Sequence, residues 1–199
     1  MGVTAAGARI GNLTLAVNVI VMQFFQFFSF FIDGFAYSGE AIVGLRFGEK
    51  DFKALHRSVV RLLQWTLGTG VVFTIGYFIS LESISGMLTE SSQVVAGVVD
   101  LTLWVGLIPL VSCWSFIFDG FYVGITDTFK MMVSTLLGGI AFFLVIGMSN
   151  IGEALPSTGN RIIWTAFLSY LFLRGLYLTL MWRPTLRNIV GKMEVSRVE

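Results

Sequence analysis

Five long apolar stretches decide what this chain can fold into. Each is close to 20 residues or longer, and a helix of about 20 residues crosses the hydrocarbon core of a bilayer. Of the 199 residues, 55% are hydrophobic and 13% are charged, whereas a soluble domain is about 25% charged. We therefore expect an all-α integral membrane protein, a bundle of five transmembrane helices in a single domain over residues 1–199. The predicted spans cover residues 13–44, 59–80, 95–123, 131–148 and 162–181.

Lysine and arginine gather on one side of these spans. They follow the first and third spans and fill the tail: Arg46, Lys50, Lys53, Arg57, Arg61, Lys130, Arg183, Arg187, Lys192 and Arg197. The other side has Arg9 and Arg161, and its predicted loop, residues 81–94, contains Glu82 and Glu90 without a basic residue. Because basic loops stay in the cytoplasm, we expect the N-terminus outside and the C-terminus inside. The predicted location is the plasma or inner membrane, with several passes. The basic start of the second span is expected to meet anionic lipid headgroups.

The first span carries two carboxylates, Asp33 and Glu40, inside an otherwise apolar run. Seven residues make nearly two helical turns, so both side chains point the same way, with Tyr37 between them. Ionisable groups at membrane depth are costly and usually mark an ion or substrate path. Asp33 and Glu40 are therefore the first candidate site residues.

Two further charges are expected at the same depth. The midplane of the hydrocarbon core lies about 15 Å from either edge. Counting 1.5 Å per residue from the basic ends places Asp33 about 20 Å deep, Glu40 about 9 Å, Asp119 about 16 Å and Arg174 about 14 Å. This shared level predicts a common central site in which Arg174 is a fixed counter-charge. Tyr37 and Tyr122 either pack between helices or line the cavity, and the sequence leaves both possibilities open.

Two pairs of glycines have the GxxxG spacing that allows helices to approach closely. They are Gly44 with Gly48, and Gly120 with Gly124. This spacing permits a close helix contact near the candidate acids but is only weakly specific for one.

Three motifs resemble a known transporter family. FIDGFA at residues 31–36 and EAIVG at 40–44 resemble the long eighth span of MATE (multidrug and toxic compound extrusion) transporters. FDGFYVGIT at residues 118–126 is similar to the end of the tenth span. The Asp-Gly-Phe-Ala form resembles the DinF-like branch of the family.

The resemblance implies that this chain is the partial C-terminal lobe of a twelve-helix protein, spans eight to twelve, whose partner is a missing N-terminal lobe. Members of the family export drug-like, often cationic organic molecules in exchange for H⁺ or Na⁺, and these ions are the only cofactors expected. Asp119 matches a family position that takes part in cation coupling. Asp33 and Glu40 match the DinF-type motif. Phenylalanine and tyrosine rings in such a cavity would hold an organic cation through cation–π contacts.

Other interpretations remain open at this stage. Asp33 and Glu40 could hold helices together by bonding Arg174, which would suit a membrane scaffold that transports nothing. Paired acids could also activate water in an intramembrane hydrolase. We predict no enzyme, because the chain has no Walker loop, no His/Cys metal spacing and no Gly-x-Ser-x-Gly motif. A net charge of +1 argues against a nucleic-acid partner. The expected partners are the lipid bilayer and a small organic cation.

Overall fold

The chain forms long helices in the computed structural model, which describes residues 11–149 and 156–195, with side chains for 11–149 and 158–187. The helices are α2 (Asn12–Gly48), α3 (Phe52–Leu88), α4 (Ser92–Val99), α5 (Thr102–Gly124), α6 (Thr128–Met148) and α7 (Pro156–Val195). No strand occurs in these ranges. All except α4 are long and apolar enough to cross a membrane. The predicted all-α membrane bundle with five membrane-spanning helices is therefore confirmed.

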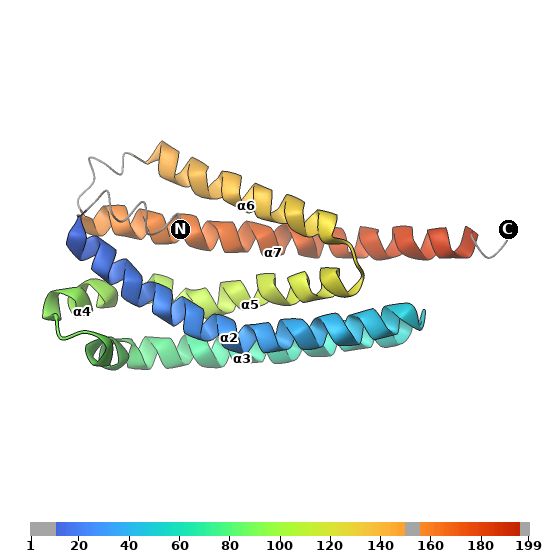
Figure 1. Cartoon of the computed structure of the whole chain (residues 1–199), viewed down its shortest axis with the longest axis horizontal. Coiled ribbons are helices and arrows are strands. Elements are labelled where there is room, and N and C mark those ends of the chain that lie inside the picture. The colour runs from blue at the N-terminus through green and yellow to red at the C-terminus, as the bar shows by residue number, and fades with distance from the viewer. Residues whose placement is uncertain (1–10, 150–155, 196–199) are drawn as a thin grey trace.

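Helix α5 holds the bundle together. It packs against α2, α3 and α7, while α6 packs mainly on α7 (Figure 1). Helix α2 begins beside the start of α7 and crosses α5 obliquely, so that its second half lies beside α3 (Figure 1). At 1.5 Å per residue its 37 residues extend about 55 Å, longer than the hydrocarbon core, so α2 must tilt or project from the bilayer.

The segment predicted as the third span is divided in the structure. Residues 95–99 belong to α4, and α5 starts after a turn at Asp100 and Leu101. The turn is held by packing, because Leu101 is 1% exposed, and by the Thr102 hydroxyl, which donates to the Val99 carbonyl at 2.5 Å. Close contact of Gly97 with the Val17 side chain fixes α4 on α2. Apolar residues continue across the turn, so hydropathy gives no sign of it.

The expected long loop over residues 81–94 is mostly helical, which corrects the sequence-based interpretation. Helix α3 continues to Leu88, and only three residues separate it from α4. Leu81 and Ser85 are buried on this extension, so packing against α4 keeps it helical despite the polar residues around Glu82.

Glycines make the crossing of α2 and α5 unusually close. A Cβ on Gly120 would lie 2.2 Å from the Ala36 carbonyl oxygen, and one on Gly124 would lie 2.7 Å from the Glu40 carbonyl oxygen. Gly44 also lies against Gly124, whereas a Cβ on Gly48 would meet nothing within 4 Å. Three of the four predicted GxxxG glycines therefore form the contact.

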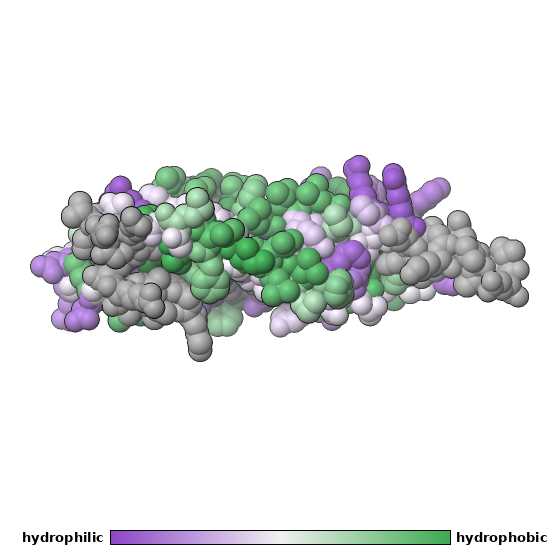
Figure 2. Space-filling model, turned by 90° about the horizontal axis from the view of Figure 1, so that it is seen from above, coloured by the Kyte–Doolittle hydropathy of each residue, from purple (hydrophilic) through white to green (hydrophobic). Residues whose placement is uncertain are grey.

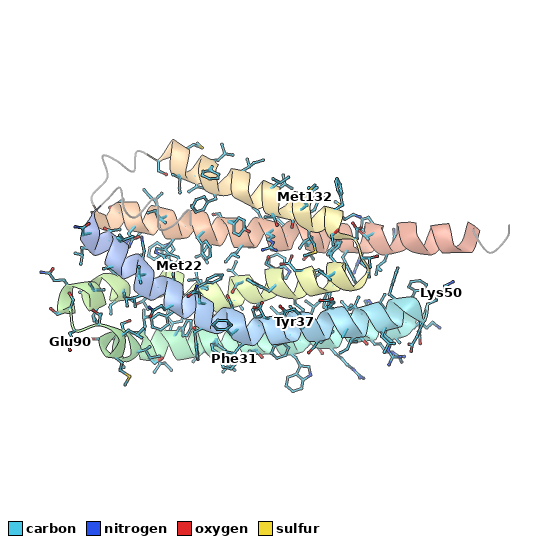
Figure 3. All side chains as sticks on the ribbon, viewed as in Figure 1. Met22, Phe31, Tyr37, Lys50, Glu90 and Met132 are labelled. Atoms are coloured by element: carbon cyan, nitrogen blue, oxygen red, sulfur yellow. The ribbon has the colours of Figure 1, made fainter. Side chains whose placement is uncertain are left out.

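The bundle has an apolar middle and two polar ends. Figure 2 shows hydrophobic side chains covering the central part of this face, with hydrophilic residues toward both ends. Lys50 lies at one end, where α2 meets α3, and Glu90 lies at the other (Figure 3). The α5–α6 connection, just before Lys130 of α6, lies at the same end as the α2–α3 connection (Figure 1). Of the basic residues predicted to face the cytoplasm, those that the structure describes thus lie toward one end of the bundle.

Candidate functional site

Asp119 and Arg174 form an ion pair between α5 and α7. Arg174 Nη2 donates to Asp119 Oδ2 at 2.6 Å, and the side chains are only 17% and 14% exposed, respectively. Arg174 comes directly before Gly175, where an added Cβ would lie 3.4 Å from the Ser115 backbone on α5. The two helices are therefore in contact at this level, and the guanidinium reaches the carboxylate. The expected role of Arg174 as a counter-charge therefore has a definite partner, Asp119.

The pair leaves polar atoms unsatisfied. Asp119 Oδ1 and Arg174 Nε are buried and have no hydrogen-bond partner among the described residues, and the Ser115 hydroxyl shares this condition. Ser115 lies one helical turn before Asp119, on the same side of α5. A buried unpaired polar atom costs about 1–3 kcal/mol. One carboxylate oxygen of Asp119 therefore remains able to accept a proton or a further hydrogen bond.

Asp33 and Glu40 occupy the rim of the α2–α5 interface. Both are half-buried, and within the described residues neither has a hydrogen bond or ion pair. The alternative in which they bond Arg174 is not what the structure shows, because Arg174 binds Asp119. Tyr37 is 70% exposed and lies midway along the bundle (Figure 3), so it does not pack between these helices.

The helix register places these acids at a common level. Helices α2 and α5 run the same way (Figure 1), with Ala36 against Gly120 and Glu40 against Gly124. Asp119 therefore lies level with the turn between Asp33 and Glu40. The depths expected from the sequence agree with this register.

The acids also share a side of the bundle. Phe31 packs on Phe73 of α3, with ring centroids 5.0 Å apart, and Asp33 and Glu40 follow it by two and nine residues. Around the helix axis, Asp33 therefore lies about 200° and Glu40 about 180° from Phe31, so both are directed away from α3. On α5, Cys113 contacts α3 through Gly70, and Asp119 lies about 120° from Cys113. The three acids thus face the side opposite α3 without being joined by a hydrogen bond in the described structure.

Tyr122 packs in the core. It is fully buried, and its hydroxyl donates to the Leu178 carbonyl at 2.9 Å. Its ring lies 5.5 Å from that of Trp182. Of the two possibilities left open for Tyr122, the structure favours packing between α5 and α7.

Several buried polar contacts were not foreseen from the sequence. Trp164 Nε1 donates to Asn18 Oδ1 at 2.8 Å and joins α7 to α2. The Tyr77 hydroxyl donates to the Phe24 carbonyl at 2.7 Å and joins α3 to α2. An asparagine near the start of an apolar span is the one signal that could have indicated the first contact.

The other possible sites are poorer candidates. In the described residues no group of three or more His, Cys, Asp or Glu side chains is placed to hold a metal ion. A cavity of about 310 Å³ lies between α2 and α3, away from the acids. Its lining is apolar except for Gln23 and the Tyr77 hydroxyl: Gln23, Phe24, Phe27, Tyr77, Ile84 and Leu88.

Comparison with known proteins identifies the family. The MatE family profile matches residues 1–148, about three quarters of the chain. The chain belongs to the MatE family. The resemblance predicted from the motifs is confirmed, and together with the five apolar helices it makes this MatE chain a multi-pass membrane protein.

Relatives of this MatE chain occur in bacteria and plants. It is 30% identical over 186 residues to DNA damage-inducible protein F of Escherichia coli, covering 94% of this chain and 39% of that protein. It is 26% identical to Protein DETOXIFICATION 45, chloroplastic, of Arabidopsis thaliana, in a match that covers 90% of this chain and 32% of that protein. It is 27% identical to Protein DETOXIFICATION 42 of the same plant, in a match that covers 84% of this chain and 32% of that protein. The MatE chain thus spans well under half the length of these relatives. No solved structure matches it.

Proposed function

We propose that this chain is part of an antiporter that exports organic cations in exchange for H⁺ or Na⁺. The observation that carries the proposal is the Asp119–Arg174 ion pair, buried in the apolar part of a MatE-family bundle. Charged side chains at membrane depth are expensive to maintain and are found mainly on ion and substrate paths. Asp119, with Asp33 and Glu40 at the same level, is the proposed coupling and substrate site.

The half-satisfied pair supplies a way to exchange ions. Arg174 binds one oxygen of Asp119, and the other is buried without a partner. A proton or Na⁺ at that oxygen would satisfy it and weaken the hold of Arg174. Such a change can drive transport only if the ion prefers one of two arrangements of the helices. The contact between α5 and α7 is the proposed element that differs between them.

Asp33 and Glu40 would receive the organic cation. They are half-buried and lie on the side of the bundle away from α3, beside the exposed ring of Tyr37. A carboxylate attracts the positive charge, and a tyrosine face adds a cation–π contact of about 0.5–2 kcal/mol. Because the relatives are far longer, we propose that the rest of the protein, an N-terminal lobe, forms the opposite wall of the cavity.

The proposed orientation follows from the basic end. The α2–α3 and α5–α6 connections, with Arg46, Lys53 and Lys130 in the adjoining helix ends, would face the cytoplasm of a plasma or inner membrane. The end with Glu90 would face outside. An organic cation would then leave toward the Glu90 end while H⁺ or Na⁺ enters.

Gradient-driven export from proteoliposomes containing the full-length protein tests the proposal. Ethidium movement would be followed with an imposed pH or Na⁺ gradient. We expect Asp119→Asn, Asp33→Asn and Glu40→Gln each to lower the gradient-driven rate about tenfold or more, within the usual range of coupling free energies. Glu90→Gln, an exposed acid at the end of the bundle, is the matched control and should transport normally.

Loss of folding must be distinguished from loss of coupling. Asp119→Asn leaves Arg174 buried without its carboxylate, which can destabilise the protein. The double variant Asp119→Asn with Arg174→Gln removes both charges and should restore stability without restoring transport. If all three amide variants exported ethidium at the wild-type rate, the proposal would be wrong. A wild-type protein that moved no cation under either gradient would favour the scaffold.

A further inference from the structure

The start of α3 carries a stripe of basic residues. Lys53, Arg57 and Arg61 follow each other at intervals of four, and all three are exposed. Residues four apart lie on one face of a helix, drifting about 40° per step. The next position in the series is Trp65, whose side chain is 72% exposed. A basic stripe therefore leads directly to an exposed indole ring.

These charges find no counter-charge in the described protein. Glu49 pairs with Arg46 at 2.8 Å, Asp51 accepts a hydrogen bond from the Ala54 backbone at 2.9 Å, and Asp127 pairs with Lys130. The nearby carboxylates are thus engaged, and Lys53, Arg57 and Arg61 form no ion pair within the described residues. The stripe is therefore free, within the described part of the chain, to bind an anion supplied from outside it.

The same face fixes the depth of the stripe in the membrane. About two and four turns after Trp65 the same face exposes Val72 and Ile79, which are 68% and 79% exposed. Tryptophan is enriched at the boundary between lipid and water. Arg61 lies one turn before Trp65, about 6 Å toward the water, and Arg57 about 12 Å. Because a headgroup layer is about 5–8 Å thick, the backbone of Arg61 lies within this layer and that of Arg57 about 4 Å beyond it, a distance that an arginine side chain can span.

We propose that the start of α3 binds an anionic phospholipid. The phosphate lies between the guanidinium groups of Arg57 and Arg61, whose planar donors match phosphate oxygens. The indole of Trp65 packs beside the glycerol and upper acyl chain. Lys53 adds a longer-range attraction from the water. The site is separate from the acids at the membrane centre and does not depend on transport.

Lipid binding to the purified full-length protein tests this site. Native mass spectrometry in detergent would compare bound phosphatidylglycerol with phosphatidylcholine. We expect the wild type to favour phosphatidylglycerol and the Arg57→Gln, Arg61→Gln double variant to lose that preference. Each substitution should weaken phosphatidylglycerol binding about fivefold. Arg46→Gln is the matched control, because Arg46 already pairs with Glu49, and it should keep the preference.

The remaining outcomes separate the possible occupants. An excess of inorganic phosphate should leave phosphatidylglycerol bound, since the acyl chains contribute to binding. Displacement by phosphate would show a free-anion site and overturn the proposal. Equal retention of the two lipids by the wild type would also overturn it, as expected if the rest of the protein covered the stripe. The proposal would also be overturned if the Arg57→Gln, Arg61→Gln variant had a normal melting temperature and kept the lipid preference of the wild type.

Discussion

Replacing Gly120 by alanine tests whether the crossing of α2 and α5 positions the acids. The new Cβ would lie 2.2 Å from the Ala36 carbonyl oxygen, and ordinary contacts begin at 3.4 Å, so the helices would have to separate by about 1 Å. The obstacle is backbone and cannot rotate away. Overpacking of this kind costs up to about 3 kcal/mol, and alanine recovers about 1 kcal/mol of helix propensity. We expect a net loss of about 2 kcal/mol.

Gly34→Ala is the matched control on α2. A Cβ there would meet nothing within 4 Å, so the propensity gain of about 1 kcal/mol stands alone. The assay is the apparent melting temperature of the full-length protein in detergent. Gly120→Ala should melt below the wild-type temperature, in keeping with a loss of about 2 kcal/mol, and Gly34→Ala at or above it. Equal melting of the two variants would refute the close crossing.

Three substitutions test the contacts that join α7 to the rest of the bundle, each followed by the same melting assay. Tyr122→Phe removes a buried hydrogen bond to an α7 carbonyl and should cost about 1 kcal/mol; an unchanged melting temperature would contradict this bond. Trp164→Phe leaves the side-chain amide oxygen Oδ1 of Asn18 without its donor and should cost about 1–3 kcal/mol. A more stable variant would contradict the contact. Asp100→Asn breaks an exposed pair with Arg161, and such pairs contribute little. A large drop in its melting temperature would show a role for this pair that its exposure does not predict.

Much of the helical architecture could be predicted because a membrane leaves few alternatives. Backbone groups in lipid must bond within their own helix, so an apolar stretch of sufficient length is almost certain to be helical. The glycine spacing also indicated the close crossing, since Gly120 and Gly124 have no side chain to hold helices apart. These predictions depend on composition and spacing, which the sequence displays directly.

The details that failed depend on contacts between distant segments. The turn at Asp100 and Leu101 is made by packing of α4 on α2, and the apolar pattern continues through it. The sequence placed Asp33, Glu40, Asp119 and Arg174 at one depth but could not choose the partner of Arg174. That choice depends on the rotation of each helix about its axis, which is set by packing between distant segments such as α5 and α7. Hydropathy does not record them.

The most direct test of the exchange mechanism is the affinity of the purified full-length protein for tetraphenylphosphonium, measured across pH and Na⁺ concentration. If H⁺ or Na⁺ bound at Asp119 disfavours the organic cation at Asp33 and Glu40, the dissociation constant should rise as pH falls or as Na⁺ increases. In Asp119→Asn, with Arg174→Gln to keep the site neutral, that dependence should disappear while the protein remains folded. An unchanged dependence in this variant would contradict the assignment of coupling to Asp119.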